Sequence, residues 1–533
     1  MLIANARQMR ECDRYTIEEL GLPGIALMES AGRGATEVLL ALLEEAELEP
    51  GRLRFGVMAG GGNNGGDGFV VARRLLDLGC TVDVVLLGVR DRYAGDAAIQ
   101  LALLERVLAG ALAPGEGTLH GLGDALAGGE ELDALLEALP GFDVIVDGLL
   151  GTGLSKEVRS PYLETIDHIN ASGALVLALD IPSGVCSDTG RRLGAAVEAT
   201  ATATFALPKF GHVLYPGRAL AGRLEVVDIG IPLGVYGITG IAAQLLDAET
   251  ARLLLPERPL NAHKGTFGHV LVVGGAAGKG GALAMSGMAA LRTGAGLVTT
   301  AGAREVAPVV TALQPELMTE VVFDADGQAV PEPEAVLTHK TVLALGPGLG
   351  TGPAARSVLE RLLERATVPC VLDADALNLV AAKPSPISAL ATLSGRCPIV
   401  LTPHPGEFGR LAQTTALEAS SAPIPHALAL AAASGCVVVL KGAATVIAHP
   451  AGLVAVNSTG NPGMATAGMG DVLTGIIASF IAQGLSAWDS ARVGVYCHGL
   501  AGDIAAERSG MRSLVASDVI AAIGEAIDRC EAD

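Results

Sequence analysis

The sequence lacks the cysteine pattern of a metal-binding or disulfide-linked protein. Its eight cysteines are scattered over 533 residues, with no C-x-x-C pair and no zinc-like spacing with histidine. They are Cys12, Cys80, Cys186, Cys370, Cys397, Cys436, Cys497 and Cys530. This distribution argues against a zinc module and is typical of thiols in a reducing cytosol.

The sequence also lacks a surplus of positive charge. Lys and Arg together number 36, against 57 Asp plus Glu, which gives a formal net charge of -21 at pH 7. A protein that grips nucleic acid through its phosphates needs the opposite sign. The balance therefore argues against nucleic acid as a partner, although it leaves room for a local basic pocket.

Long apolar segments are missing as well. The first residues, MLIANARQMRECDRYTIEE, carry charges where a signal peptide has an apolar core. Every long apolar stretch is interrupted well before the ~20 residues that span a membrane. We therefore expect a soluble, cytoplasmic protein with no membrane partner.

What the sequence does have is length and glycine. A chain of 533 residues exceeds one ordinary core, which predicts two domains, each large enough to enclose a site. Glycine occurs 70 times, roughly double its usual share of ~7%, and it gathers after apolar runs instead of spreading as in a linker. That distribution indicates close approach of the backbone to ligands.

Short β-branched runs alternate with helical patterns in both halves, which predicts α/β domains with mostly parallel sheets. In the first half these runs are RFGVMA (54–59), TVDVVLL (81–87), FDVIVD (142–147) and ALVLALD (174–180). In the second half they are HVLVVGG (269–275), GLVTTAG (296–302), TVLALG (341–346), CVLDAD (370–375), PIVLT (398–402) and CVVVLKG (436–442). The alternation weakens after LEVVDIGIP (224–232), so we place a boundary near residue 245, with domains at 1–240 and 250–533.

The loop GGGNNGGDG (60–68) follows the first of these runs. Its glycines formally satisfy G-x-G-x-x-G, but a dinucleotide-binding unit also needs an acidic residue at the end of the next strand, and Asp91 comes late there. A hairpin is the alternative, although the helical pattern FVVARRLLDLG that follows favours a strand-to-helix loop. Such a loop offers backbone N–H groups that suit phosphate.

Two further strand ends carry oxygen donors. VIVDGLLGTGLSKEV (144–158) supplies Asp147 and a second glycine loop, and LALDIPSGV (177–185) supplies Asp180 and Ser183. A single aspartate at such a position is more often a helix cap. Because ligands bind at the carboxyl ends of parallel strands, three polar strand ends together favour a binding site.

GGGNNGGDG, VDGLLGTGL and ALDIPSG, followed by TFALPKFG (204–211), resemble the epimerase domain of the NAD(P)H-hydrate repair enzymes. The resemblance implies a Rossmann-like, three-layer domain that binds hydrated NADH or NADPH, with Asp180 as a catalytic residue near the reacting ring. It also implies a K⁺ ion on Asn64, Asp147 and Ser183, an all-oxygen set that suits a weakly hydrated cation. The implied substrate contacts are Asn63, Asn64, Gly65, Gly66, Asp67, Gly151, Thr152, Gly153, Leu154, Ser155, Lys156, Glu157 and Asp180.

Two positions in this half stay open. Gly61 stands where the family's motif usually has proline, which loosens the loop without removing a donor. Lys209, in PKFG, could neutralise phosphate or assist proton transfer, and a structural role fits it equally well.

The second half has glycine turns of its own. GKG (278–280) nearly matches a Walker A loop, but Gly280 stands where that motif needs Ser or Thr, so we reject a P-loop NTPase. AGMGD (467–471) places Asp471 where the apolar pattern VLTGIIASF begins. That carboxylate could simply cap a helix. It also resembles the catalytic aspartate of ribokinase-like phosphotransferases, which accepts a proton from the acceptor hydroxyl.

Three more motifs accompany this turn: LDADALN (372–378), LTPHPGEF (401–408) and LKGAAT (440–445). Taken singly, His404 would be an exposed histidine and Lys441 a capping or snorkelling lysine. Together they resemble the ADP- or ATP-dependent NAD(P)H-hydrate dehydratase domain, a ribokinase-like α/β fold, over essentially the whole second half. The implied hydrate site is Ala282, Gly348, Gly350, His404 and Asp471, and the implied nucleotide site is Lys441, Gly442, Ala443, Ala444, Thr445 and Gly470.

The two resemblances together imply a bifunctional metabolite-repair enzyme. One half would epimerise the R and S hydrates. The other would dehydrate the S hydrate at the expense of ADP or ATP, with Mg²⁺ held on the nucleotide through phosphates and water. Similarity to bacterial members favours ADP, and we expect a homo-oligomer.

Two rival functions remain. A vitamin or sugar kinase would leave a stable phosphate ester, and a non-catalytic nucleotide-binding module is plausible for the first half. Two complete sets of site residues favour catalysis in both halves.

Overall fold

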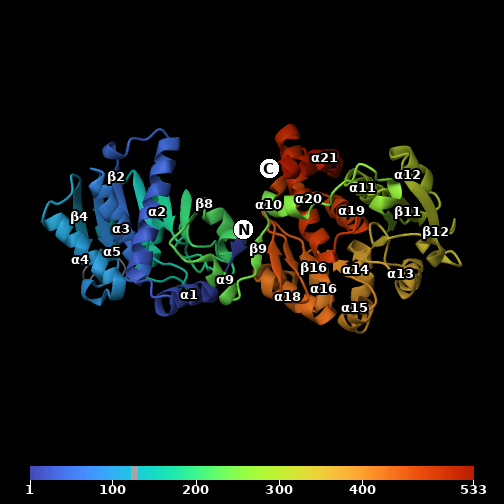
Figure 1. The fold of residues 1–533 in the computed structure, drawn as a ribbon, viewed down its shortest axis with the longest axis horizontal. Helices are drawn as coiled ribbons and strands as arrows, with labels where there is room; N and C mark the ends of the chain where they lie inside the picture. Colours follow the sequence, from blue (N-terminus) through green and yellow to red (C-terminus); the bar gives the residue numbers. More distant parts are fainter. Residues whose placement is uncertain (122–129, 533) are drawn as a thin grey trace. The chain divides into compact units, whose positions relative to one another are not determined.

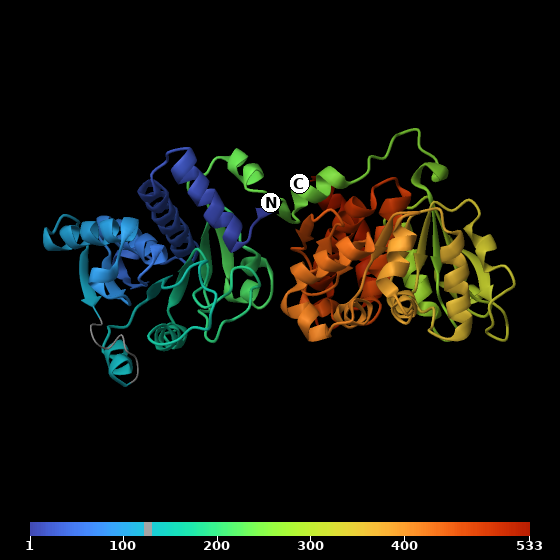
Figure 2. The same ribbon diagram turned by 90° about the horizontal axis from the view of Figure 1, so that it is seen from below.

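A computed structural model describes residues 1–121 and 130–532. The chain divides into two compact units, Leu2–Ala242 on one side and Ala243–Asp533 with Met1 on the other. In both units helices pack along a β-sheet (Figures 1 and 2), which confirms the predicted α/β class. Within the described ranges, no helix combines the length and apolar character that crossing a membrane requires.

The first unit contains a parallel sheet with the strand order β4-β3-β2-β5-β6-β7-β8, whose edge strands β4 and β8 are labelled in Figure 1. The order reverses between the neighbours β2 and β5. Such a reversal opens a crevice at the carboxyl ends of the strands, so the loops after Ala59 and Gly148 meet there. The strands are β2 (Arg54–Ala59), β3 (Thr81–Leu86), β4 (Glu116–Gly121), β5 (Val144–Gly148), β6 (Leu175–Leu179), β7 (Ala201–Phe205) and β8 (Arg223–Val227).

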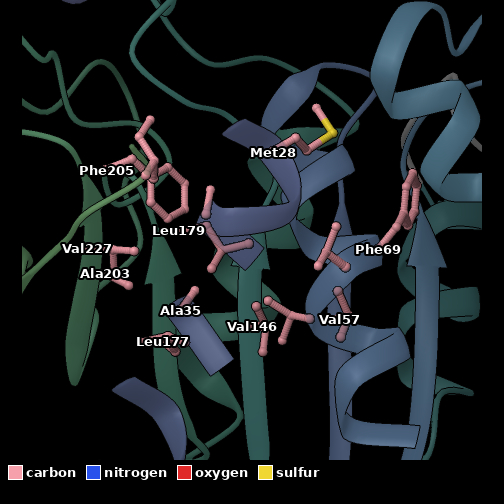
Figure 3. Packing of buried hydrophobic residues seen from close by; sticks show 14 of the residues in the cluster. Met28, Ala35, Val57, Phe69, Val146, Leu177, Leu179, Ala203, Phe205 and Val227 are labelled. Carbon is pink, nitrogen blue, oxygen red and sulfur yellow. The ribbon is translucent and has the colours of Figure 1, made fainter. Parts of the chain in front are cut away.

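Helices cover both faces of this sheet, as is usual for a parallel sheet. Because successive residues of a strand point to opposite faces, neighbouring residues pack against different helices. Val57 shares a buried cluster with Met28 of α2 and Phe69 of α3, as Figure 3 shows. The next residue, Met58, belongs to the cluster on the other face, with α5 and α6. The predicted three-layer arrangement is therefore confirmed. The main helices are α1 (Ala6–Arg14), α2 (Gly24–Glu45), α3 (Asn63–Asp77), α4 (Gly95–Ala109), α5 (Glu130–Glu137), α6 (Tyr162–Ala171) and α9 (Leu233–Ile238).

The second unit contains a mixed sheet with the strand order β9-β18-β17-β16-β15-β14-β13-β10-β11-β12. From β16 to β12 neighbouring strands are parallel, whereas β17 is antiparallel to both of its neighbours. The order reverses between β10 and β13, so the loops after these two strands meet. The strands are β9 (Ala243–Leu245), β10 (His269–Val273), β11 (Leu297–Ala303), β12 (Met318–Phe323), β13 (Val342–Leu345), β14 (Cys370–Leu372), β15 (Ile399–Leu401), β16 (Val437–Leu440), β17 (Val446–Ala448) and β18 (Val454–Val456).

One helix of this unit, α19 (Met469–Ala482), is buried along nearly its whole length. It packs against β10, β13 and β14 and between α11 and α20. The apolar run after Asp471 therefore forms a central helix, as expected for a helix that is apolar all round. The other helices include α11 (Gly280–Arg292), α13 (Pro353–Arg365), α14 (Ala374–Ala381), α16 (Pro405–Ala412), α18 (Pro423–Ser434), α20 (Ala487–Ser509) and α21 (Ala516–Ala532).

Candidate functional site

A cavity of about 690 Å³ lies at the carboxyl ends of β2, β5 and β6 in the first unit. Glu157, one of the predicted contacts, is exposed and lies outside its lining. Gly65 and Gly66 also lie outside the lining. The predicted residues that line it are Asn63, Asn64, Asp67, Gly151, Thr152, Gly153, Leu154, Ser155, Lys156 and Asp180.

The glycine loop before α3 brings two loops into close contact. A Cβ on Gly60 would lie 1.9 Å from the carbonyl oxygen of Leu149, and one on Gly65 would lie 2.0 Å from that of Gly60. Only glycine fits such approaches. Because α3 begins at Asn63, directly after Gly62, the hairpin alternative is wrong. The first turn of α3 instead offers its unpaired N–H groups near the cavity, where an anion can bind.

Asp180 is held in an uncommon backbone conformation at the end of β6. Its φ is 62°, and the Ile181 N–H donates to the Leu179 carbonyl across it at 2.7 Å. Positive φ is rare for residues other than glycine, and such strain gathers at functional sites. The geometry therefore supports a functional role for this carboxylate.

Lys209 fixes the same carboxylate. Its Nζ donates to Asp180 Oδ1 at 2.5 Å, to Thr204 Oγ1 at 2.9 Å and to the Phe205 carbonyl at 2.9 Å. These bonds use all three ammonium protons, and Lys209 is only 1% exposed. Of the roles left open for this lysine, holding Asp180 is the one its contacts support.

Three further carboxyl groups line the same cavity, those of Asp13, Asp67 and Asp96. Asp67 is 7% exposed, and burial, followed by the charges of Asp180 and Asp13, raises its pKa well above the ordinary value. Asp13, on α1, lines the cavity too, and burial together with the Asp180 charge raises its pKa to about 6. Asp13 was not predicted, because nothing in the local sequence around it marks a site.

The three predicted cation ligands come together beside this cavity. Ser183 Oγ donates to Asp147 Oδ1 at 2.6 Å, and the Leu150 N–H donates to Ser183 Oγ at 2.8 Å. Asn64 Nδ2 donates to the Leu150 carbonyl at 3.2 Å, while the buried Asn64 Oδ1 has no hydrogen-bond partner among the described residues. Burial raises the pKa of Asp147 to about 6. Asn64 and Ser183 both contact the Leu150 carbonyl, and a buried carbonyl oxygen without a partner in such a group of oxygen atoms fits a cation.

In the second unit the predicted catalytic aspartate lies at the start of α19. The helix begins at Met469 after Gly468, whose φ is 92°, so Asp471 is its third residue and not its cap. Burial raises the pKa of Asp471 to about 6; the Asp373 charge adds to the shift and Lys441 opposes it. A carboxyl group with this pKa is ionised at neutral pH but binds a proton readily, as a general base must.

Lys441 lies beside this turn and pairs with Asp373. Its Nζ is 2.7 Å from Asp373 Oδ1, and Asp373 Oδ2 accepts from Thr474 Oγ1 at 2.8 Å. A Cβ on Gly470 would lie 3.1 Å from the same Nζ, so glycine keeps this ammonium accessible. Asp373 and Thr474 were not predicted, although Asp373 directly follows β14 in the quoted motif LDADALN.

The loop that contains His404 and the loop from Lys441 to Thr445, both predicted to bind ligands, form ordered turns. His404 caps α16, its Nδ1 accepting from the Gly406 N–H at 3.0 Å, and its half-exposed ring lies 3.4 Å from Glu407 Oε1. Glu407 Oε2 is in turn 3.9 Å from Lys441 Nζ, which links the histidine to the lysine. Residues Lys441 to Thr445 form the turn between β16 and β17, closed by Thr445 Oγ1 donating to the Gly442 carbonyl at 3.0 Å. Ala443 and Ala444 lie at the tip of this turn.

The glycine turn after β13 meets the start of α11. A Cβ on Gly348 would lie 3.3 Å from Ala282 Cβ, so these two predicted residues are neighbours. The Gly350 N–H donates to Asp375 Oδ2 at 2.7 Å, and that oxygen lies 3.1 Å from Lys279 Nζ. The loops after β10 and β13 therefore supply one continuous surface.

Family models match both halves of the chain. Residues 270–525 match a model described as NAD(P)H-hydrate dehydratase, and residues 24–211 match one described as YjeF-related protein N-terminus. The two models together cover the regions in which the candidate sites lie.

Full-length relatives match as well. The chain is 40% identical over 527 residues to the bifunctional NAD(P)H-hydrate repair enzyme of Moorella thermoacetica, covering 98% of this chain and 95% of that one. It is 35% identical over 521 residues to the enzyme of the same description from Escherichia coli, covering 97% and 92%. Among solved structures, the ADP/ATP-dependent NAD(P)H-hydrate dehydratase of Bacillus subtilis is 29% identical, with a TM-score of 0.47 over 54% of this chain and 99% of that one.

Proposed function

The chain belongs to the bifunctional NAD(P)H-hydrate repair enzymes, and on this premise we propose which residues of each unit carry which reaction. The chain combines an epimerase and a dehydratase. We assign the epimerase to the unit Leu2–Ala242 and the dehydratase to the unit Ala243–Asp533. The observation that supports this assignment is that each unit places a partly buried aspartate near a glycine-rich turn: Asp180 at the cavity of the first and Asp471 at the start of α19 in the second.

In the epimerase the hydrated nicotinamide nucleotide occupies the cavity at the ends of β2, β5 and β6. The N–H groups at the start of α3, with Asn63 and Asp67, bind its polar groups, and the loop Gly151–Glu157 borders the other wall. Asp180, held by Lys209, lies where it can exchange a proton with the reacting ring. Gly65 and Gly66 support this arrangement from behind by letting α3 pack closely.

A potassium ion would be held by Asn64, Asp147 and Ser183. The support is the buried Asn64 Oδ1, which has no partner among the described residues, and the contacts that join Asn64 and Ser183 through the Leu150 carbonyl and Ser183 to Asp147. When bound, the ion would supply a fixed positive charge next to the substrate loop. The test replaces K⁺ by Na⁺ in the assay. We expect a fall in the epimerase rate with the dehydratase rate unchanged, and an epimerase indifferent to the exchange would count against this ion.

In the dehydratase, Asp471 accepts the proton of the substrate hydroxyl as that oxygen takes a phosphoryl group from the nucleotide. Hydroxide is a poor leaving group, since water has a pKa of about 15.7, whereas phosphate leaves readily when the ring nitrogen donates its electron pair. The N–H groups at the start of α19 and the Lys441 ammonium stabilise negative charge on the transferred group.

We propose that the two substrates of the dehydratase bind on different sides of the glycine turn before α19. Ala282, Gly348, Gly350 and His404 would contact the hydrate, and the turn Lys441–Thr445 with Gly470 would contact ADP or ATP. Mg²⁺ would arrive on the nucleotide phosphates, where it neutralises their charge. We favour ADP as the phosphoryl donor. A cytoplasmic location is supported by the eight free thiols, and we propose that the enzyme is a homo-oligomer.

The experiment that tests this function follows recovery of reduced-nicotinamide absorbance from a mixture of both hydrate epimers with ADP and Mg²⁺. Wild type should restore the whole mixture. Asp180→Ala should restore one epimer quickly and the other slowly, and Asp471→Ala should restore neither. A persistent phosphate ester in place of recovered absorbance would establish the rival kinase activity instead.

A further inference from the structure

The lining of the first unit's cavity includes two carboxyl groups that the proposed mechanism does not yet use, those of Asp13 and Asp96. We propose that Asp13, on α1, is the second proton-transfer residue of the epimerase and acts as the acid to the base Asp180. This inference rests on the proposed placement of the epimerase at this cavity. It concerns a residue that belongs to none of the quoted motifs.

The position of Asp13 supports this role. It lines the same cavity as Asp180 and Asp67, although it comes from a different part of the chain. Within the described residues, no hydrogen bond or ion pair occupies its side chain, and the same holds for Asp67, which is 7% exposed. Two carboxyl groups without protein partners, Asp67 buried and Asp13 partly buried, both line one cavity, which points to a ligand that supplies the missing partners.

The contrast with Asp180 assigns the roles. Asp180 is paired with the Lys209 ammonium at 2.5 Å, so its carboxylate is held in a fixed position at the cavity, as a base beside the reacting ring requires. Asp13 has no such cation bound to it, and burial raises its pKa to about 6. A pKa raised toward neutral pH lets the group both donate a proton and take it back during the reaction, and its protonated fraction grows as pH falls toward 6.

The reaction needs both groups. In the hydrate, the hydroxyl carbon is bonded to the ring nitrogen. Asp180 removes the hydroxyl proton, the carbonyl forms, and the carbon–nitrogen bond breaks with its electron pair passing to nitrogen, which takes a proton from Asp13. After the aldehyde rotates, nitrogen attacks its other face. Nitrogen then returns its proton to Asp13, and Asp180 returns its proton to oxygen. Both carboxyl groups end as they began, so no co-reactant is required.

Other charged groups face Asp13 and shape its titration. Asp67 on α3 and Asp180 repel its ionised form, and Lys209 opposes them. Arg10, on its own helix, lines the same cavity, and the charge of Asp13 acts on Tyr236 of α9. Since an acid must be protonated, the epimerase kcat should fall as pH rises through the Asp13 pKa. If the fall in kcat disappears when Asp13 is substituted, it comes from Asp13 and not from Asp67.

The test uses the full chain and follows interconversion of the two epimers by chromatography without nucleotide, so that the dehydratase is silent. Asp13→Asn should lower kcat by about 10²-fold or more, leave KM within about twofold, and abolish the fall in rate above about pH 6. Asp13→Glu, which retains an acid, should recover part of kcat and keep a titrating limb. Glu11→Gln, which neutralises a carboxylate on the same helix, is the matched control and should behave as wild type.

Each outcome decides a separate point. Wild-type kcat in Asp13→Asn, or a change confined to KM, overturns the role of Asp13. If Asp180→Asn also keeps the wild-type rate, the placement of the epimerase itself fails. If Asp180→Asn loses activity and Asp13→Asn does not, only this inference fails. Should Asp13→Asn not fold, Asp13→Ser serves in its place: wild-type kcat and an unchanged pH limb in that variant, which has no acid at this position, would equally overturn the proposal, and dehydration of pure S hydrate reports the integrity of the rest of the chain.

Discussion

The two units use the same pair of residue types in opposite orientations. In the first, the Lys209 side chain is 2% exposed and that of Asp180 is 15% exposed, so the carboxylate faces the cavity and the lysine supports it from behind. In the second, the Asp373 side chain is 1% exposed and that of Lys441 is 20% exposed, so the ammonium faces outward. Each pair thus exposes the group that we propose for its reaction, a carboxylate as base in the first unit and an ammonium for phosphate in the second.

The largest effect should follow removal of the hidden lysine. Lys209→Met leaves Asp180 without its cation, and losing one partner of a buried pair costs about 3 kcal/mol or more. We expect epimerisation to fall about 10²-fold, the first unit to melt earlier, and dehydration of S hydrate to persist. Chromatography of the epimers and thermal unfolding measure these changes. Lys383→Met, which removes a more exposed lysine from its contact with Glu360, serves as the control. A stable variant with full epimerase activity would show that Lys209 contributes neither to stability nor to the position of Asp180.

The orientation of these pairs could be foreseen only in part. Ligands bind at the carboxyl ends of parallel strands, and this principle pointed to Asp180 and Lys441, which follow strands. Asp471 was predicted because it lies where a helix begins. Neither signal pointed to Asp13, which reaches the cavity because α1 packs there. Nor did either indicate the burial order within each pair, which depends on neighbours such as Thr204 and Thr474 from distant parts of the sequence.

More of the fold than of the site could be predicted from the sequence, although two strands of the first unit were missed. The β-branched runs became β2, β3, β5 and β6 in the first unit, because such residues suit a buried parallel sheet. β4 (EGTLHG) is an edge strand with little apolar character, and β7 (ATATF) is made of small residues. Both form because their neighbours supply hydrogen bonds, a tertiary effect that no local pattern records.

The next effect tests the lysine that faces outward. Lys441→Met removes a charge that we place at the nucleotide, while Asp373 keeps its hydrogen bond from Thr474. We expect KM for ADP to rise about tenfold, equal to about 1.4 kcal/mol, with epimerisation unchanged. Initial rates against nucleotide concentration measure it. A fall in kcat with KM unchanged would contradict a binding role and place the lysine at the reacting group instead.

A smaller change probes the space around the same ammonium. In Gly470→Ala the new Cβ would lie 3.1 Å from Lys441 Nζ, which the flexible lysine can relieve by moving. We expect a few-fold rise in KM for ADP together with unchanged or improved stability, since alanine favours a helix over glycine by about 0.5–1 kcal/mol. Gly524→Ala on α21, where a Cβ meets nothing within 4 Å, is the control and should change neither activity nor KM. Equal kinetics in the two variants would exclude crowding at Gly470.

The last effect concerns stability and pH in the first site, where the Lys209 charge acts on Asp13, Asp67 and Asp180. The pKa of Asp13 is raised to about 6 on folding, so its protonated form favours the folded state and this contribution is lost as pH rises through 6. Asparagine mimics the protonated form. Asp13→Asn should therefore stabilise the first unit at pH 8, by at most about 3 kcal/mol, a gain that vanishes near pH 4. Urea unfolding at both pH values measures it, and a gain independent of pH would contradict the assignment.

The buried helix α19 also has a consequence for the order of biosynthesis. The first unit is complete at Ala242, whereas β10, β13 and β14 of the second must wait for Met469–Ala482 to cover one of their apolar faces. Because domains fold as units during synthesis, the epimerase can mature while the ribosome is still translating the dehydratase. A nascent chain that stalls between these points would carry a folded first unit and an exposed sheet, a natural substrate for chaperones.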